Sequence, residues 1–201
     1  MARLTLCLLL VVLWSQLYSC KTDPANTTPT LRTVRIQPYE GFSLVLADSL
    51  ADACRQIFQN VVVGSVRALP VSSFNKARNR YRADILIESL ARFADKETVV
   101  IGLTHHDIST TKAPYPDWGV MGLGYQPGSS CVVSTYRFKR KNLNELYKVA
   151  LHELGHNSGL PHCEDDHCYM RDANGGYPLD QLTGFCTSCR TDLLQRVWRI
   201  K

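Results

Sequence analysis

From residue 33 onward, short apolar stretches alternate with amphipathic ones. β-branched runs at residues 33–36, 61–66 and 98–103 predict three strands. Apolar residues recur at helical spacing across residues 46–58 and 80–93, which predicts two helices between the strands. In the second helix we expect these side chains to face inward: Ile85, Leu86, Leu90 and Phe93. The pattern indicates a mixed α+β domain.

The second half of the chain changes character. Residues 105–130 are rich in Pro, Gly, Trp and Tyr, which favours a long loop with short strands at residues 120–123 and 132–136. Asn142, followed by Glu145 three residues later, predicts a helix from residue 142 to about 158. A last helical pattern contains Leu193, Leu194, Val197 and Trp198.

The N-terminus has the features of an export signal. Arg3 precedes an apolar run at residues 4–14 that is too short to span a bilayer. Leu17-Tyr18-Ser19-Cys20 resembles the bacterial lipobox, in which a signal peptidase cuts before a lipid-modified cysteine. We therefore expect a leader at residues 1–19, a lipid anchor at Cys20, a flexible tether at residues 20–32 and a folded domain at residues 33–201.

This interpretation places the protein on a bacterial membrane, facing the periplasm or the cell exterior. The alternative is an ordinary secretory signal, and Asn26-Thr27-Thr28 would be a glycosylation acceptor in a eukaryotic secreted protein. The formal charge of +5, from 23 basic and 18 acidic residues, is too small to indicate nucleic acid. A chain of 201 residues fits one domain, and we expect a monomer.

The chemistry lies on the helix at residues 142–158. On a helical wheel one side collects the apolar residues Leu143, Leu146, Tyr147, Ala150 and Leu154. His152 and His156 point the other way, and side chains four residues apart can share one metal ion. Glu153 completes the His-Glu-x-x-His arrangement of zinc peptidases, as the base for a zinc-activated water. Histidines on a surface helix are the alternative.

The sequence after the helix favours the metal site. Gly159 can take the left-handed conformation that ends a helix, and Pro161 prevents the helix from resuming. The chain can then reverse so that His162 becomes a third ligand beside His152 and His156. Three protein nitrogens leave a fourth tetrahedral position open, which is the arrangement of a catalytic zinc.

His-Glu-x-x-His-x-x-Gly-x-x-His is the signature of the metzincin peptidases. Continuing into Cys163, Cys168, Met170 and Cys186-Thr187-Ser188-Cys189, the chain resembles the archaemetzincins over residues 152–189. The resemblance implies a zincin domain, with a twisted mixed sheet over the active-site helix and an activity that is aminopeptidase-like in some members. It makes Met170 the Met-turn residue beneath the metal. It also makes Cys163, Cys168, Cys186 and Cys189 a structural zinc site, so that each chain would hold two zinc ions.

The residues alone leave the cysteines with two interpretations. Two close cysteine pairs are a frequent closed zinc arrangement, whereas export to an oxidising compartment favours disulfides. Cys54 is expected in the core, and pairing with Cys131 stays open. His105, His106 and Asp107 are interpreted as loop residues. The basic residues Arg137, Lys139, Arg140 and Lys141 are interpreted as a solvated loop.

Together these patterns predict a zinc metallopeptidase that hydrolyses peptides or small proteins, with residues 120–123 as a candidate sheet edge for the substrate. The alternative from another class is a two-zinc binding module with weak or no turnover. A nucleic-acid-binding zinc module is disfavoured by the open three-histidine site and the modest charge.

Overall fold

The computed structural model describes residues 33–196 and 198–199. The predicted leader, the Cys20 anchor, the tether and Val197 lie outside the described residues. Among the residues that the structure does describe, no helix has the length and apolar character needed to cross a bilayer.

The main sheet has five strands in the order β2-β1-β5-β9-β8. They are β1 (Thr33–Pro38), β2 (Val61–Val63), β5 (Thr98–Thr104), β8 (Gly122–Gly124) and β9 (Ser130–Ser134). The first four in this order run parallel, and β8 pairs antiparallel with β9 at the edge. The sequence therefore predicted the central strand β5 correctly. Of the predicted edge at residues 120–123, residues 122 and 123 lie in the edge strand β8, whereas Val120 belongs to a strand of a second sheet.

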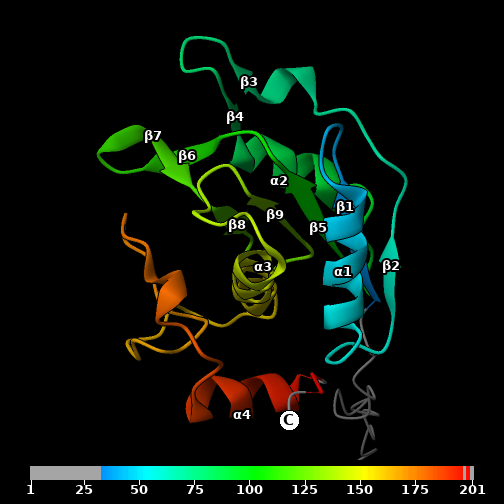
Figure 1. Cartoon of the computed structure of the whole chain (residues 1–201), viewed down its shortest axis with the longest axis vertical. Coiled ribbons are helices and arrows are strands. Elements are labelled where there is room, and N and C mark those ends of the chain that lie inside the picture. Colours follow the sequence, from blue (N-terminus) through cyan, green and yellow to red (C-terminus); the bar gives the residue numbers. More distant parts are fainter. Residues whose placement is uncertain (1–32, 197, 200–201) are drawn as a thin grey trace, which may run out of the picture.

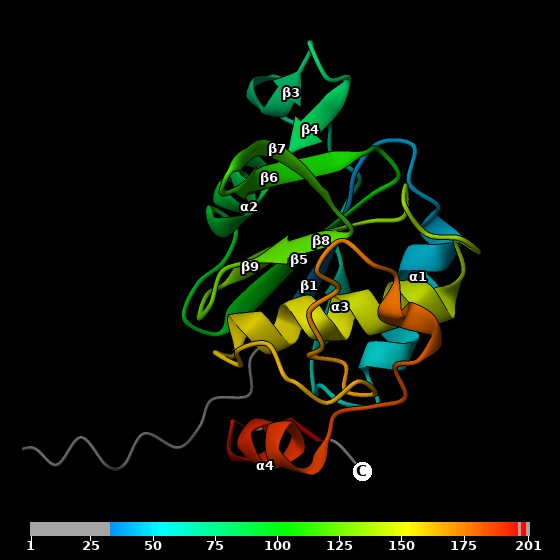
Figure 2. The same ribbon diagram turned by 90° about the vertical axis from the view of Figure 1, so that its left-hand side faces the viewer.

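Helices cover both faces of this sheet. α1 (Leu44–Cys54) and α3 (Leu143–Asn157) lie on one face, and α2 (Ala83–Ala91) lies on the other (Figure 1). The alternation of β5 produces this division, because Ile101 packs in the core of α1 and α3 while Val100 packs in the core of α2. α4 (Thr187–Gln195) lies on the side of α3 away from the sheet (Figure 2).

A second, smaller sheet was not predicted. Its strands, in the order β3-β4-β6-β7, are β3 (Phe74–Asn75), β4 (Arg80–Arg82), β6 (Ile108–Lys112) and β7 (Tyr115–Val120). Two 3₁₀ turns, η1 (Val71–Ser73) and η2 (Pro178–Asp180), complete the elements. The region expected to be a long loop is thus largely a hairpin. The sequence did not predict these strands, because they contain a proline and polar residues and show little alternation of apolar and polar positions.

The helix predicted at residues 80–93 is shorter than expected. Residues 80–82 form strand β4, so α2 begins at Ala83. Ile87 is buried, whereas Ile85, which was expected to face inward, is only half-buried. Phe93 is exposed, and the guanidinium carbon of Arg67 lies 3.8 Å from the centroid of its ring. Cation–π contact with an arginine suits an exposed ring, so the helical spacing alone misassigned the face.

Other boundaries shift less. The first predicted helix ends at Cys54, before Ile57 and Phe58, and β2 ends at Val63. In the C-terminal pattern Leu193 and Trp198 are buried, whereas Leu194 is exposed. The predicted helix at residues 142–158 has its caps at Asn142 and Ser158, as expected.

Candidate metal centres

The start of α3 is fixed by its cap. The side-chain oxygen of Asn142 accepts the backbone N–H of Glu145 at 3.0 Å. The buried carboxylate of Glu145 does not return to Asn142. Instead it accepts the backbone N–H of Arg140 at 2.9 Å and the hydroxyl of Tyr177. Glu145 therefore ties the preceding loop and the C-terminal segment to the first turn of the helix.

α3 is buried on two sides, not one as the wheel predicted. The apolar side packs on the sheet, and Met170, fully buried, packs against Gly155 on the other side. A Cβ built on Gly155 would lie 2.5 Å from the Met170 sulfur, so only glycine admits this contact. The C-terminal segment therefore closes over the helix at the level of the histidines.

The helix ends as the sequence predicted. Gly159 has φ +92°, the N–H of Gly159 donates to His156 O at 2.8 Å, and the N–H of Leu160 donates to Gly155 O at 3.0 Å. These two bonds form a Schellman motif, which satisfies the last carbonyls of the helix and reverses the chain. The reversal returns His162 toward the histidines of α3.

Three imidazoles converge at this point. Ring nitrogens of His152, His156 and His162 lie within 4.8 Å of one another, and the Nε2 atoms of His152 and His156 are 3.1 Å apart. Two nitrogens bound tetrahedrally to one zinc would be about 3.3 Å apart, so the donor set fits the ion.

Backbone carbonyls orient two of the rings. The Nδ1–H of His152 donates to Tyr169 O at 2.7 Å, and that of His156 donates to Leu160 O at 2.8 Å. Nε2 then keeps its lone pair for a metal. Burial lowers the pKa of His152 to about 3, so its ring is neutral at neutral pH, as a ligand must be.

The third ring has an acidic neighbour that sequence reasoning missed. Asp172 Oδ2 lies 3.6 Å from His162 Nδ1, and both side chains are half-exposed. Asp172 follows Met170 by two residues, and nothing in the sequence motif marks it. A carboxylate that hydrogen-bonds the second ring nitrogen of a metal-binding histidine orients the ring, and Asp172 lies close enough to reach this nitrogen by a small movement.

Glu153 lies beneath the edge strand β8. Its side chain is buried, and burial raises the pKa of its carboxyl to about 8. Cβ atoms built on Gly122 and Gly124 would lie 2.4 and 3.2 Å from its carboxylate oxygens. The two glycines therefore let the sheet edge approach the carboxylate closely, a feature that the sequence contained but that only the strand pairing explains.

A cleft of about 810 Å³ opens over these groups. It lies between the hairpin of β6 and β7, strand β8, helix α3 and the segment after Tyr169. Glu153 and the three histidines all line it. The candidate metal ligands and the candidate base thus share one accessible space.

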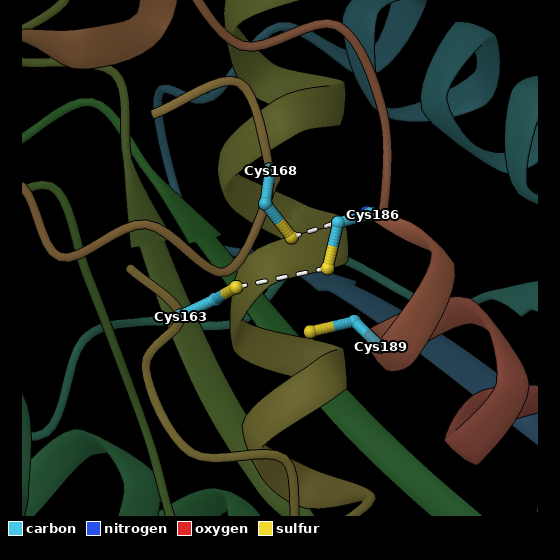
Figure 3. A group of neighbouring side chains, drawn as sticks. All are labelled: Cys163, Cys168, Cys186 and Cys189. Carbon is cyan, nitrogen blue, oxygen red and sulfur yellow. Dashed lines mark hydrogen bonds between the residues drawn. The ribbon is translucent and has the colours of Figure 1, made fainter. Parts of the chain in front are cut away.

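The four cysteines of the motif form a separate cluster (Figure 3). Their sulfur atoms lie within 4.8 Å of one another, and Cys163 Sγ is 3.7 Å from Cys186 Sγ. Two thiolates bound to one zinc would be about 3.8 Å apart, whereas a disulfide requires about 2.05 Å. The cysteines are free thiols, so the structure contains no disulfide in this cluster. Cys168 Sγ also accepts the N–H groups of Met170 and Cys186, at 3.4 and 3.3 Å.

The cluster is joined directly to the histidine site. Cys163 follows His162, and its N–H donates to Met170 O at 2.8 Å. Cys186 caps the start of α4, and Cys189 lies in its first turn. One ion held here would join the part of the chain just after His162 to the start of α4.

The remaining candidates lie elsewhere. Cys54 and Cys131 are buried free thiols, so they are not paired. His105 and His106 stack on each other at 4.0 Å, outside the lining of the cleft.

The basic residues before α3 are exposed and lie in a loop, as predicted, but Arg137 and Arg140 also form ion pairs. Arg137 makes a two-point contact with the buried carboxylate of Asp107 at 2.9 and 3.0 Å. Arg80 lies 3.1 Å from the same carboxylate. Asp107 is therefore a structural ion-pair residue, because it joins β4 to the segment after β9. Arg140 pairs with Asp180.

Comparison with known proteins agrees with this architecture. The model of peptidase family M54 matches residues 48–196. Archaemetzincin from Halobacterium salinarum is 33% identical over 144 residues, which cover 65% of this chain and 80% of the relative.

Two solved structures are also similar. Archaemetzincin from Archaeoglobus fulgidus, in complex with malonate, superposes with a TM-score of 0.67 at 25% identity, covering 80% of this chain and 99% of that one. Archaemetzincin from Methanopyrus kandleri gives 0.67 at 27% identity, covering 82% and 94%. The predicted α+β zincin fold is confirmed, and the chain belongs to the archaemetzincins, the zinc metallopeptidases of peptidase family M54.

Proposed function

We propose that the protein hydrolyses peptide bonds at a zinc ion held by His152, His156 and His162, with Glu153 as the general base. When bound, zinc would supply a Lewis acid that polarises a carbonyl and lowers the pKa of water. Its positive charge would also lower the pKa of Glu153, which burial alone raises to about 8, and so favour the carboxylate form that a base requires. The carboxylate of Glu153 would take the proton of the attacking water and pass it to the leaving amine. The carbonyls of Tyr169 and Leu160 would keep the two helix imidazoles oriented for the metal.

One observation carries this proposal. The Nε2 atoms of His152 and His156 face each other at 3.1 Å in a cleft that the Glu153 carboxylate also lines. A site built only to hold a metal structurally has four protein ligands and needs no buried carboxylate beside it. The three-nitrogen donor set with Glu153 therefore favours catalysis over a binding module.

The test is a digest of a peptide library by the zinc-loaded full chain and by Glu153→Ala. Removal of a general base costs about 10²- to 10⁴-fold in rate, and chelation should abolish cleavage. Glu88→Ala is the control, because Glu88 is exposed on α2 away from the cleft. Equal cleavage by wild type and Glu153→Ala would refute the mechanism. Tight peptide binding without cleavage by either protein would favour the binding module.

We also propose a second, structural zinc at Cys163, Cys168, Cys186 and Cys189. The 3.7 Å sulfur separation between Cys163 and Cys186 supports it. Metal analysis of the purified chain should find two zinc ions. A single zinc with a thiol titration that shows oxidised cysteines would favour disulfides instead.

Aminopeptidase-like cleavage, which the resemblance implies, is a finer proposal with its own test. Such an enzyme must recognise the free amine of the substrate. Matched peptides with free and acetylated N-termini separate the cases, because acetylation should stop an aminopeptidase and leave other peptidases unaffected.

Export and anchoring through Cys20 are proposals that rest on the sequence alone. Labelling with radioactive palmitate in a bacterial host, compared with Cys20→Ala, tests the anchor. Equal incorporation of palmitate into wild type and Cys20→Ala would exclude Cys20 as the site of lipid attachment. The predicted monomer is checked by the mass of the chain in solution.

A further inference from the structure

A buried ammonium group lies in the cleft beside the zinc site. Lys148 is on α3, 8% exposed, and lines the cleft together with His152 and Glu153. Lys148 and His152 are four residues apart, so they share one face of the helix about 6 Å apart along its axis. The Nζ atom of Lys148 donates to Leu179 O at 2.7 Å.

Lys148 has no carboxylate partner among the described residues. Of the two acidic groups nearby, Glu145 accepts from Arg140 N–H and Tyr177 hydroxyl, and Asp180 pairs with Arg140. The ammonium group of Lys148 has three N–H donors, and the structure gives it one hydrogen bond, to the carbonyl of Leu179. The ammonium of Lys148 contributes to lowering the pKa of Asp180, but no carboxylate among the described residues forms an ion pair with it. A buried ammonium with one hydrogen bond and no ion pair is receptive to an anion in the cleft.

The other cations of the cleft differ from Lys148. Arg137 is bound by Asp107, and Arg171 lies 3.0 Å from Asp166. Lys112 is exposed and contacts Asn174 at 3.3 Å. Lys148 is therefore the cation of this cleft, among the described residues, that is buried and has no ion pair within 4 Å.

The direction of β8 indicates which part of a substrate would reach Lys148. β8 lies against Glu153 at Gly122, and the backbone oxygen of Tyr125, directly after the strand, accepts from Asn157 at 2.9 Å. β8 thus runs in the same direction as α3, with its start toward Lys148. An extended peptide that pairs antiparallel with this edge would run the opposite way. Its residues after the cleaved bond would lie on the Lys148 side.

We propose that Lys148 binds a carboxylate of the substrate on the C-terminal side of the cleaved bond. The carboxylate belongs either to the C-terminus of the peptide or to an acidic side chain near the cleaved bond. This inference rests on the proposed peptidase function and adds a substrate class to it: peptides that carry an anionic group just after the bond that is cut. Lys148 is a specificity residue, and the ammonium would form a charge-assisted hydrogen bond with it.

The experiment measures peptide binding by calorimetry to the zinc-loaded full chain carrying Glu153→Ala, so that no turnover is needed. Three peptides of otherwise identical sequence are compared: one with a C-terminal acid, one with a C-terminal amide and a Glu after the cleaved bond, and one with an amide and a Gln there. We expect at least one acidic peptide to bind about tenfold more tightly than the neutral one. The peptide that shows the preference identifies the source of the carboxylate.

Lys148→Met and Lys148→Arg are then introduced into the same background, with Lys112→Met as the matched control from the same cleft. Lys148→Met should remove the preference for the acidic peptide and leave the neutral peptide unchanged. Lys148→Arg should retain most of it, and Lys112→Met should retain all of it. If Lys148 served only to hold the carbonyl of Leu179 in place, Lys148→Met would weaken the binding of the acidic and the neutral peptide equally. That result, or equal binding of acidic and neutral peptides by the unmodified background, would overturn the proposal.

The two proposals can fail separately. Acid-selective binding that depends on Lys148, without hydrolysis by the wild-type chain, would refute the peptidase function and keep the carboxylate site. Cleavage by the wild-type chain that ignores the charge after the cut bond, with no acid preference in the binding measurement, would refute the carboxylate site alone.

Discussion

At the scale of single residues, the candidate metal ligands have partners at positions that the zinc motif does not specify. Tyr169 and Leu160 offer backbone carbonyls to His152 and His156, and Asp172 offers a carboxylate to His162. The motif specifies the donor atoms, but it does not specify the groups that turn the donors toward one point. Those groups come from the chain reversal after α3 and from the Met170 turn.

Asp172→Asn should weaken zinc binding at the histidine site by about 10- to 100-fold, because a neutral amide orients and polarises His162 less strongly. Competition with a chelator of known affinity measures the change. Asp166→Asn is the control, since Asp166 pairs with Arg171 on the same segment and makes no contact with a histidine. Equal zinc affinity of Asp172→Asn and wild type would show that His162 is oriented without this carboxylate.

At the scale of elements, α3 and its two ends build the site. The cap at Asn142, the length of the helix and the glycine that ends it could all be predicted, because they depend on local hydrogen bonds and backbone conformation. The wheel was wrong about the second face of the helix. Glu153 and His156 are buried because β8 and the Met170 turn cover them, and neither contact is local in sequence.

Gly159→Ala should lower the free energy of unfolding by about 1–2 kcal/mol, because an L-residue resists the left-handed conformation at φ +92°. It should also weaken zinc binding, since the turn places His162. Gly184→Ala is the control, because a Cβ there would meet no atom within 4 Å. Denaturant unfolding and chelator competition measure the two effects. A stable Gly159→Ala protein with wild-type zinc affinity would mean that the turn tolerates a side chain.

At the scale of the whole molecule, the C-terminal segment packs under α3, and the cysteine cluster brings distant parts of that segment together. Cys186→Ser should reduce the zinc content from two ions to one and lower the melting temperature, because binding to a closed site contributes to folding. Cys54→Ala, a buried cysteine outside the cluster, should keep both ions. Metal analysis and thermal unfolding provide the measurements. Unchanged zinc content in Cys186→Ser would refute the second site.

The second sheet adds a pH-dependent contribution to stability. Burial alone would raise the pKa of Asp117, but the Ser109 hydroxyl and the guanidinium groups of Arg80 and Arg78 outweigh it and hold the pKa below its usual 3.8. A pKa that folding lowers contributes stability above the unfolded value and loses it as the pH falls through the folded value.

Asp117→Asn should therefore destabilise the protein at pH 7, by about 1–3 kcal/mol, through its lost charged hydrogen bonds. The difference from wild type should shrink as the pH falls below 3.8. Denaturant unfolding across this pH range checks the sign. A difference that stays constant with pH would show that the charge of Asp117 contributes nothing.

The sequence by itself determined the zinc motif, the helix that carries it, the glycine turn, the family and the α+β class. The family was indicated by the resemblance of residues 152–189 to the archaemetzincins. The other features follow from local spacing and backbone preference, which act over a few residues. Only the tertiary structure decided that Asp107 and Arg137 form an ion pair, that Asp172 lies near His162 and that the hairpin of β6 and β7 borders the cleft. It also decided that Lys148 is buried there with no ion pair among the described residues. Each of these depends on contacts between residues far apart in the chain, and such contacts leave no periodic pattern in the sequence.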